Sequence, residues 1–316
     1  MYRLGIDLGG INIAVGLVTE DCQLVVKKSV PTLSKGRKAT DIAKLMCDTA
    51  LSLIKDADLT EDDIISIGIG IPGAVDRQNG KVIRVANLRL DGFDLASFFK
   101  KYTKIPIILD NDANCAALAE AVAGAGKGRK LALTVTLGTG IGGGIVFNRR
   151  VYSGFNFAAG EVGHMVTHVG GRKCGCGRRG CFERYASATA IIHDAKVAVR
   201  KHPESKILEL SGGDIQKISG RKVFQAKDLG DEVAVAVVDN YIKELGEGLI
   251  NLINIAAPEV LILGGGISNQ GEKLLKPLRK YVYDRCYGTN LIPMTEITCA
   301  TLGNDAGIIG AALLHK

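Results

Sequence analysis

Residues 4–10 read LGIDLGG, an apolar strand that ends in a turn of two glycines, and two further strand-like segments follow up to Val30. The stretch LTVTLGT, which begins at Leu133, takes the same course and reaches Phe147 before its next turn. Around these two units, short apolar strands alternate with amphipathic helices, a pattern typical of an α/β fold. The repeated strand–glycine turn–strand unit predicts two similar lobes that face each other across a cleft.

The hydrophobic periodicity also predicts where the individual helices and strands lie. Helices are expected over residues 38–55, 95–101, 113–123, 188–201, 229–257, 271–283 and 306–314. Strands are expected over residues 3–7, 14–18, 24–30, 64–71, 107–110, 131–137, 144–147 and 260–264.

The chain has 316 residues, a length that suits two domains, and 47% of them are hydrophobic, which is ample for a buried core. No apolar run is long enough to cross a membrane, and the amino-terminal stretch lacks the hydrophobic region of a signal peptide. Five cysteines are scattered, mostly in apolar segments: Cys22, Cys47, Cys115, Cys286 and Cys299. Because they look like reduced thiols, we expect a cytoplasmic protein with no membrane partner.

The net charge is +7, from 40 basic and 33 acidic residues. A basic balance can mark a nucleic-acid-binding protein, but no recognition helix or aromatic–basic repeat accompanies it here. Aromatic residues make up only 5% of the chain and Trp is absent, which argues against base-stacking platforms. We therefore expect no nucleic-acid partner.

Residues 161–183 read EVGHMVTHVGGRKCGCGRRGCFE, a loop too rich in glycine and arginine to be core. It brings four metal-ligand side chains close together in sequence: His164, Cys174, Cys176 and Cys181. Three thiolates and one imidazole complete a closed, tetrahedral zinc site of the structural type. Buried free cysteines beside an unrelated histidine, or a disulfide, are the alternatives. The ligand types, their spacing and the charged surroundings favour zinc.

Two carboxylates, Glu161 and Glu183, bracket this cysteine-rich loop. A metal that pins the loop would also fix both carboxylates in space. Such an arrangement would anchor a site for a hydroxylated ligand.

Three glycine turns each follow a strand: residues 7–12 (DLGGIN), 137–144 (LGTGIGGG) and 264–266 (GGG). Glycine lets the backbone approach a phosphate closely and point its N–H groups at it. In an α/β sheet, ligands lie beyond the carboxyl ends of strands, where all three turns fall. A single such turn would be weak support, because many are simply tight turns or bulges. Three together favour nucleotide binding, although neither a Walker motif nor the dinucleotide fingerprint fits.

Asp7 stands at the mouth of the first glycine turn. A carboxylate beside bound phosphates requires a cation between them, and Mg²⁺ is the natural candidate. Alternatively, Asp7 caps the turn by accepting hydrogen bonds from its own backbone, a role that is compatible with the first.

The apolar segment 107–109 runs into DNDAN at residues 110–114, after which a helix begins. Asp112 lies just ahead of this helix and is well placed to accept a hydroxyl proton, whereas Asp110 or Asn111 could be the helix cap. Phosphoryl transfer needs positioning, charge neutralisation and a base near the attacking oxygen. With Glu161 and Glu183 as polar groups for a polyol, these residues together indicate an ATP-dependent kinase of a hydroxylated small molecule.

These motifs, together with IPG at 71–73 and LGxxAGxxGA at 302–311, occur along the whole chain in one order. In that order they resemble the ROK family of sugar kinases and repressors, within the actin/hexokinase/Hsp70 ATPase superfamily. The likeness is greatest to the bacterial ROK glucokinases. It implies a ribonuclease H-like fold of two α/β lobes around a sugar–ATP cleft. A small lobe, residues 1–112, would be completed by the last helix at 303–316, and residues 113–302 would form a large lobe with the zinc loop at 161–183.

The resemblance also implies roles for individual residues. Asp112 would be the general base that deprotonates the 6-hydroxyl of a hexose, with glucose preferred. The implied sugar-binding positions are Gly73, Asn87, Asn111, Asp112, Glu161, His164 and Glu183. The implied nucleotide-binding positions are Asp7, Gly9, Gly10, Ile11, Asn12, Gly138, Thr139, Gly140, Gly265 and Gly266. His164 would serve both zinc and sugar, Mg²⁺ would accompany ATP, and the protein would be a homodimer or homotetramer.

One departure concerns the first loop, where the family usually has Gly-Gly-Thr and this chain has Ile11. We expect the missing hydroxyl to weaken ATP binding or turnover without abolishing it, because the backbone N–H groups remain. The family's repressors carry an added helix-turn-helix before the first strand, with which this chain begins, so a repressor is not expected. A non-catalytic sugar sensor, a kinase for fructose, N-acetylglucosamine or N-acetylmannosamine, and polyphosphate as donor stay open.

Overall fold

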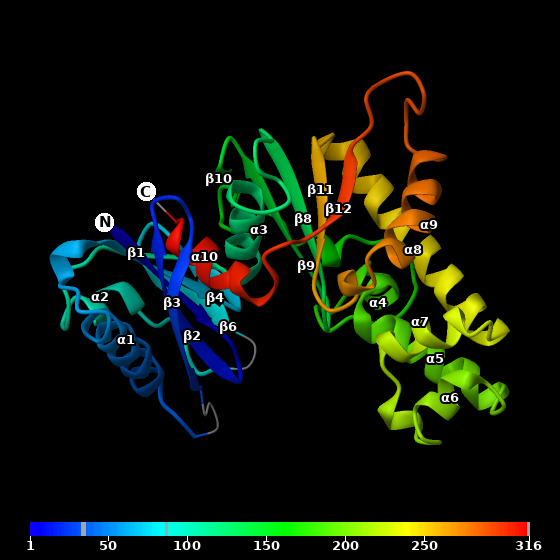
Figure 1. Cartoon of the computed structure of the whole chain (residues 1–316), viewed down its shortest axis with the longest axis horizontal. Helices are drawn as coiled ribbons and strands as arrows, with labels where there is room; N and C mark the ends of the chain where they lie inside the picture. The colour runs from blue at the N-terminus through cyan, green and yellow to red at the C-terminus, as the bar shows by residue number, and fades with distance from the viewer. Residues whose placement is uncertain (33–35, 86–87, 315–316) are drawn as a thin grey trace. The chain divides into compact units, whose positions relative to one another are not determined.

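The computed structural model describes residues 1–32, 36–85 and 88–314 (Figure 1). The chain forms two compact units. The first comprises Met1–Ala132, Gly144–Gly160 and Thr301–Lys316, and the second comprises Leu133–Gly143 and Glu161–Ala300. In the described part of the chain, no helix has the length and apolar character needed to cross a membrane.

The first unit is built on a five-stranded sheet of order β3-β2-β1-β4-β7. Its strands are β1 (Tyr2–Leu8), β2 (Asn12–Thr19), β3 (Leu24–Pro31), β4 (Ile64–Ile71) and β7 (Ile107–Asn111). The first three are antiparallel neighbours, and β4 and β7 continue the sheet in parallel to β1. Because Asp7 pairs with Gly70, and Gly70 pairs with Asp110, the parallel strands end at one common edge.

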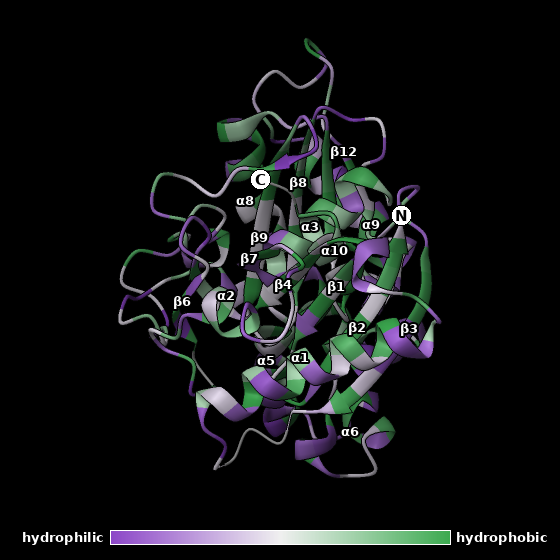
Figure 2. Ribbon diagram, turned by 90° about the vertical axis from the view of Figure 1, so that its left-hand side faces the viewer, coloured by the Kyte–Doolittle hydropathy of each residue, from purple (hydrophilic) through white to green (hydrophobic). Residues whose placement is uncertain are grey.

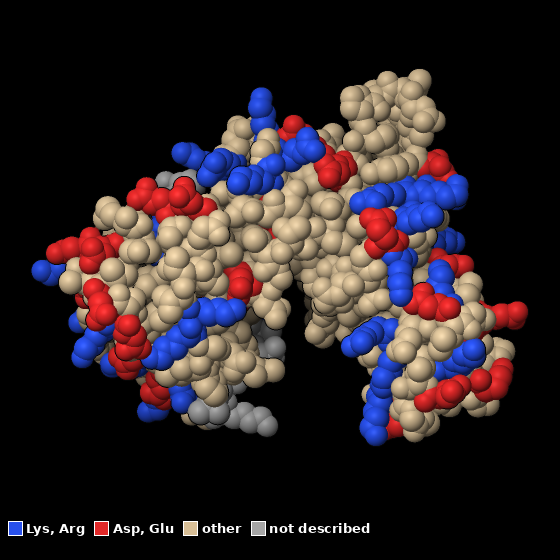
Figure 3. All heavy atoms as spheres, in the orientation of Figure 1, with Lys and Arg blue, Asp and Glu red and all other residues tan. Residues whose placement is uncertain are grey.

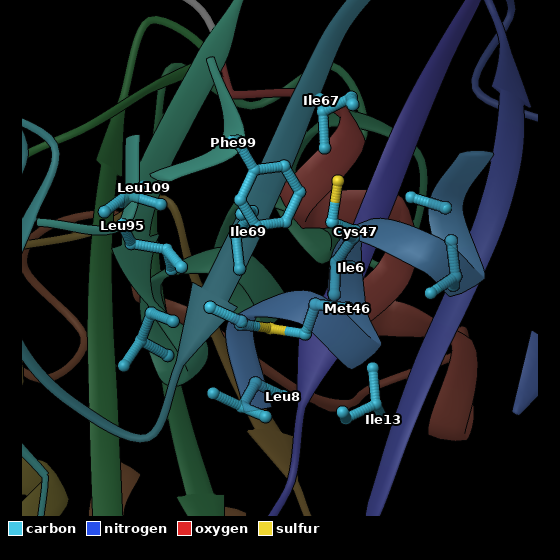
Figure 4. Close-up of a cluster of buried hydrophobic side chains, with 14 of the residues drawn as sticks. Ile6, Leu8, Ile13, Met46, Cys47, Ile67, Ile69, Leu95, Phe99 and Leu109 are labelled. Atoms are coloured by element: carbon cyan, nitrogen blue, oxygen red, sulfur yellow. The ribbon is translucent and has the colours of Figure 1, made fainter. Parts of the chain in front are cut away.

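Side chains on β1 alternate between the two faces of this sheet. Leu4, Ile6 and Leu8 belong to a buried cluster with α1 (Ala39–Asp56), whose Met46 and Cys47 point into it (Figure 4). Figure 2 shows that α1 carries hydrophobic and hydrophilic residues around its axis, as expected of a helix that buries one side.

The opposite face of the sheet meets α10 (Ala306–Ala312) without intervening side chains. A Cβ atom added at Gly5 would lie 2.0 Å from the carbonyl oxygen of Ile308, and one at Gly68 would lie 1.8 Å from that of Ala311. A Cβ atom at Gly310 would lie 1.7 Å from the carbonyl oxygen of Cys115 in α3 (Asp112–Val122). Glycine at these positions is therefore what allows α10 to pack directly on β1, β4 and α3.

Smaller elements complete the first unit: the hairpin of β5 (Gly73–Asp76) and β6 (Lys81–Val85), the short helix α2 (Leu95–Phe99) and the 3₁₀ turn Glu61–Asp63. The hairpin was not among the predicted strands. It is short, and it follows directly on Pro72, which removes a backbone donor and weakens the strand signal.

A second five-stranded sheet has the order β10-β9-β8-β11-β12. Its strands are β8 (Leu131–Leu137), β9 (Ile141–Phe147), β10 (Arg150–Val151), β11 (Val260–Gly264) and β12 (Glu296–Cys299). All five residues of β11 are buried, as expected of a strand covered on both faces. Strand β9 begins at Ile141, earlier than predicted, because its glycine run adopts an extended conformation.

The helices of the second unit are α4 (Glu183–Ala186), α5 (Ala188–Lys201), α6 (Lys206–Leu210), α7 (Gly220–Asp228), α8 (Glu232–Ala256) and α9 (Glu272–Tyr283). Of these, α8 begins where the Asp231 side chain accepts a hydrogen bond from the backbone of Ala234, and it ends at Ala257 in the left-handed region. The two sheets and their helices confirm the predicted mixed α/β fold.

Candidate active site and metal centre

The first glycine turn joins β1 to β2 and is held by its own backbone and by Thr32. The backbone N–H of Gly9 donates to the carbonyl of Asn12 at 2.9 Å, and the Thr32 hydroxyl donates to the carbonyl of Gly9 at 2.7 Å. A Cβ atom at Gly10 would meet nothing within 4 Å, and the side chain of Ile11 is 81% exposed. The outer surface of this turn is therefore open to a ligand.

Asp7 points to the start of α10, where a Cβ atom at Gly307 would lie 2.5 Å from its Oδ2. Burial raises the pKa of the Asp7 carboxyl above its ordinary value. A buried carboxylate whose charged form is disfavoured would gain from a nearby cation. The position of Asp7 thus fits the predicted Mg²⁺ ligand.

The residues 110–114 form the junction of β7 and α3. The Asn111 side-chain oxygen accepts hydrogen bonds from the backbone of Ala113 at 2.8 Å and of Asn114 at 3.2 Å, so Asn111 is the helix cap. Its amide nitrogen donates to the carbonyl of Gly73 at 3.0 Å. Asp112, the first residue of α3, is half-buried, and its Oδ1 accepts a hydrogen bond from the backbone of Ala113.

Asp110 is a buried anchor beneath this junction, with only 2% of its side chain exposed. One oxygen accepts from the backbone of Asn111 and from the Asn114 amide, both at 2.8 Å, and the other accepts from Arg77 at 3.0 Å. Burial raises the pKa of Asp110, and the bonds from Asn114 and Arg77 lower it in part. Arg77 did not emerge from the sequence, because nothing local indicates that a residue after β5 reaches the end of β7.

The other two glycine turns belong to the second unit. The Gly138 carbonyl accepts from the backbone of Ala188 at 2.9 Å, which ties the 137–140 turn to the start of α5. Gly265 has a φ of +85°, and a Cβ atom there would lie 2.5 Å from the carbonyl oxygen of Leu137. The turns that follow β8 and β11 are therefore side by side. Gly266 faces open space.

Glu183 reaches the second glycine turn, because a Cβ atom at Gly140 would lie 2.6 Å from its Oε2. Its Oε1 accepts from the Cys174 thiol at 3.1 Å. The Glu161 carboxylate is exposed, 4.0 Å from Nε2 of His164. The structure thus brings Glu161, His164 and Glu183 to the cysteine cluster. Asn87 lies outside the described residues.

The candidate metal centre consists of His164, Cys174, Cys176 and Cys181, whose ligand atoms all lie within 4.8 Å of one another. The Cys176 and Cys181 sulfurs are 3.6 Å apart, and the Cys174 sulfur is 3.8 Å from Nδ1 of His164. Zn–S and Zn–N bonds of about 2.3 and 2.1 Å in a tetrahedron place ligand atoms about 3.5–3.8 Å apart. The cluster therefore fits a structural zinc ion. All the cysteines are free, so the disulfide alternative is wrong.

Comparisons with known proteins show which proteins this chain resembles along its whole length. A glucokinase of Halalkalibacterium halodurans is 38% identical over 316 residues, which is 100% of this chain and 95% of the relative. A glucokinase of Thermotoga maritima is 36% identical over 99% of this chain and 96% of its own length. A ROK family glucokinase from Streptomyces griseus, solved in complex with glucose and AMPPNP, has a TM-score of 0.82 and 32% identity and covers 99% of this chain and 98% of its own.

The model of the ROK family matches residues 3–316, a range that takes in all three glycine turns, the β7–α3 junction and the cysteine cluster. With full-length relatives above 30% identity beside it, the match leaves one conclusion: this chain belongs to the ROK family.

Proposed function

We propose that this chain, an ATP-dependent sugar kinase, phosphorylates glucose at its 6-hydroxyl with Asp112 as the general base. The observation that carries the proposal is the register of the first sheet. Asp7 and Asp110 pair with the same residue, Gly70, on either side. Asp112 follows two residues later, so the proposed base and the proposed magnesium ligand belong to one sheet edge. The sequence relatives that carry the name glucokinase support glucose as the acceptor.

In the proposed reaction, the Asp112 carboxylate accepts the proton of the sugar hydroxyl as its oxygen attacks the γ-phosphorus of ATP. The bond between the γ-phosphorus and the bridging oxygen breaks, and ADP leaves with that oxygen. Asp7 would hold Mg²⁺, which supplies charge neutralisation on the phosphates. Asn111, already fixed by its bond to Gly73, would orient the sugar beside the base.

The remaining roles are proposals of the same kind. Nucleotide phosphates would bind the turns at 7–12, 138–140 and 265–266, and the sugar would contact Gly73, Asn87, Asn111, Glu161, His164 and Glu183. The orientation of the His164 ring supports its proposed role in binding both zinc and sugar. Its Nδ1 faces the cysteines, while its Nε2 faces Glu161.

Several properties of the whole protein stay proposals as well. The free cysteines suit the proposed cytoplasmic location. Light scattering would test assembly as a homodimer or homotetramer, and limited proteolysis would test the division into lobes 1–112 with 303–316 and 113–302. A nucleic-acid partner is not expected, and titration with duplex DNA would check this.

The test is ADP release with Mg-ATP across glucose, mannose, fructose, allose, N-acetylglucosamine and N-acetylmannosamine, repeated with polyphosphate as donor. We expect glucose and ATP to give the highest kcat/KM. Turnover with another sugar would keep the mechanism and replace the substrate. No turnover with any sugar, despite measurable glucose binding, would identify a sensor instead of a kinase.

The matched variant is Asp112→Asn, which keeps the side chain's size and the hydrogen bond to the backbone of Ala113. Loss of a general base lowers kcat by about 10²–10⁴-fold. We expect such a loss, with glucose binding by calorimetry within a few-fold of the parent. Unchanged kcat would exclude Asp112 as the base.

A further inference from the structure

A cavity lies in the first unit, away from the residues proposed for catalysis. Its volume is about 520 Å³, and its polar lining includes Arg3, Glu20, Asn148 and Arg149. Arg3 is at the amino end of β1, four residues before Asp7, and a strand rises about 3.3 Å per residue. The cavity therefore opens at the other end of the sheet, about 13 Å from the catalytic edge.

The charge balance of this cavity is positive. Among the residues that the structure describes, neither the Arg3 nor the Arg149 guanidinium lies within 4.0 Å of a carboxylate oxygen. The acidic residue of the lining, Glu20, is 3.5 Å from the amino-terminal ammonium group, which offsets its charge. Two arginines from distant parts of the chain thus line one cavity, and no carboxylate among the described residues forms an ion pair with either of them.

The surroundings strengthen this positive field. The exposed Lys127 follows α3, and the backbone N–H of Asn148 donates to the Lys130 carbonyl at 2.7 Å, so the segment after α3 lies against the β9–β10 turn. Figure 3 shows Lys and Arg side chains gathered over α3 and β10. A small anion near this surface is attracted toward the cavity.

The turn that carries Arg149 is strained. Asn148 and Arg149 have φ values of 49° and 62°, the left-handed conformation of a two-residue hairpin turn. Glycine is preferred at the second position of such a turn, and a side chain there costs about 1 kcal/mol. The chain nevertheless places an arginine there, and that arginine lines the cavity.

We propose that this cavity binds a small phosphate ester, with Arg3 and Arg149 holding the phosphate. Guanidinium groups match phosphate oxygens in bidentate geometry, and the Asn148 amide adds a further donor. Leu118 and Val122 of α3 supply an apolar wall for the carbon skeleton. A volume of about 520 Å³ suits a ligand of this size.

The position on α3 gives the site a route to the active centre. Leu118 and Val122 line the cavity, and the same helix begins at Asp112. A bound ester would therefore bias the helix that carries the proposed base. That a phosphate group binds is independent of the proposed function. The further proposal, that the ester is a hexose phosphate and acts as a product signal, rests on the proposed function.

The test is calorimetric titration of the full chain, with glucose and Mg-AMPPNP present to occupy the proposed active site. The titrants are inorganic phosphate, glucose 6-phosphate and, at matched ionic strength, chloride. We expect saturable binding of both phosphates and none of chloride. Arg3→Gln and Arg149→Gln should each weaken binding about tenfold or more, because each removes a charge-assisted contact.

Arg150→Gln is the matched control, since it removes a neighbouring charge that does not line the cavity. Its affinity should stay within about twofold of the parent. Equal weakening by Arg150→Gln would mean that a diffuse field attracts the anion and would overturn the site, as would no saturable binding of either phosphate. Arg149→Gly relaxes the turn as it removes the charge, so it keeps the test valid if Arg149→Gln folds poorly. If glucose turnover fails but phosphate binds, the proposed function is wrong and this inference stands.

Discussion

Ile11 lies in the first proposed phosphate loop, at the position where the resemblance to the ROK kinases leads us to expect threonine. Its side chain is 81% exposed at a turn whose outer surface is open, so the missing threonine hydroxyl would have had direct access to a phosphate. An exposed hydroxyl adds one hydrogen bond, and one bond to a charged group contributes about 1.5–3 kcal/mol.

We therefore expect Ile11→Thr to lower the KM for ATP or to raise kcat, by about tenfold in kcat/KM. Steady-state kinetics with ATP as the varied substrate measures the change. Ile255→Thr is the matched control, because Ile255 is a similarly exposed isoleucine on α8. Equal kinetics in the parent and in Ile11→Thr would show that the backbone N–H groups suffice.

Arg77 and Asp110 form a partly buried ion pair that we interpret as positioning the proposed base. Asp110 holds the backbone of Asn111 and the side chain of Asn114, which flank Asp112. Removal of the guanidinium leaves the Asp110 carboxylate buried with fewer partners, which raises its pKa further. Protonated Asp110 would accept weaker hydrogen bonds from Asn111 and Asn114, so it would hold the β7–α3 junction less firmly.

Arg77→Gln should therefore lower kcat about tenfold and move the acidic limb of the pH–rate profile to higher pH, while the KM for sugar changes less. Arg77→Lys, which retains the charge, should restore part of kcat. A variant that merely loosened the fold would lower the melting temperature without moving the acidic limb.

At the scale of elements, we expect the cysteine-rich loop to depend on a bound zinc ion, which its His and Cys side chains fit. The ligand atoms of the four residues lie within 4.8 Å of one another. A structural zinc ion bound there would contribute directly to the free energy of folding. Cys176→Ser removes the exposed ligand, and we expect several kcal/mol of lost stability together with a higher KM for sugar, because His164 and Glu183 are held by the same loop.

Elemental analysis and thermal unfolding would measure these changes, and the same loss should follow chelation of the parent. Cys22→Ser, outside the loop, should leave metal content at the parent level. Full metal content in Cys176→Ser would mean that another ligand set holds the ion.

Helix α10 depends on the absence of a side chain at Gly310. Its Cβ atom would lie 1.7 Å from the carbonyl oxygen of Cys115, so either α10 or α3 must move. Gly310→Ala should destabilise the protein by about 3 kcal/mol or more, measured by urea unfolding. Gly175→Ala, where an added Cβ atom meets nothing within 4 Å, should change stability by less than about 0.5 kcal/mol. Equal effects would show that α10 packs less closely than the structure indicates.

At the scale of the whole molecule, the half-buried carboxyl of Asp7 and the buried carboxyl of Asp110 make stability depend on pH. Burial raises the pKa of Asp7 and of Asp110 above the ordinary 3.8. The folded state then binds protons more tightly than the unfolded chain. The stability these groups contribute is fully present below pH 3.8 and is lost as pH rises through their folded pKa values.

The difference between the parent and Asp7→Asn isolates one of these groups from carboxyls such as Asp63 and Asp76, whose pKa is lowered. Without nucleotide and Mg²⁺, Asp7→Asn should be about as stable as the parent near pH 4 and more stable at pH 7, by about 1 kcal/mol. Urea unfolding at several pH values measures this. The same variant should lose kinase turnover. A parent that is the more stable of the two at pH 7 would contradict the assigned direction of the Asp7 pKa.

Much of the architecture was predictable because it depends on local periodicity. The strands around Leu4, Ile67 and Val260 and the helices at 39–56 and 188–201 lie close to their predicted positions. The sequence missed β5, β6, β12, α4, α6 and α7. Each is short, and the hydrophobic periodicity of a few residues does not distinguish a strand or a helix from a turn.

The sequence by itself determined the family, the glycine turns and the candidate metal ligands, because each is carried by short motifs whose residues are near one another along the chain. Only the tertiary structure decided which distant groups meet. Arg77 reaches Asp110 across 33 residues, and Asn111 reaches Gly73 across 38. Arg3 of β1 and Arg149 of the β9–β10 turn, which are far apart in sequence, line one cavity. Such pairs follow from the register and stacking of strands and helices, which spacing along the chain does not encode.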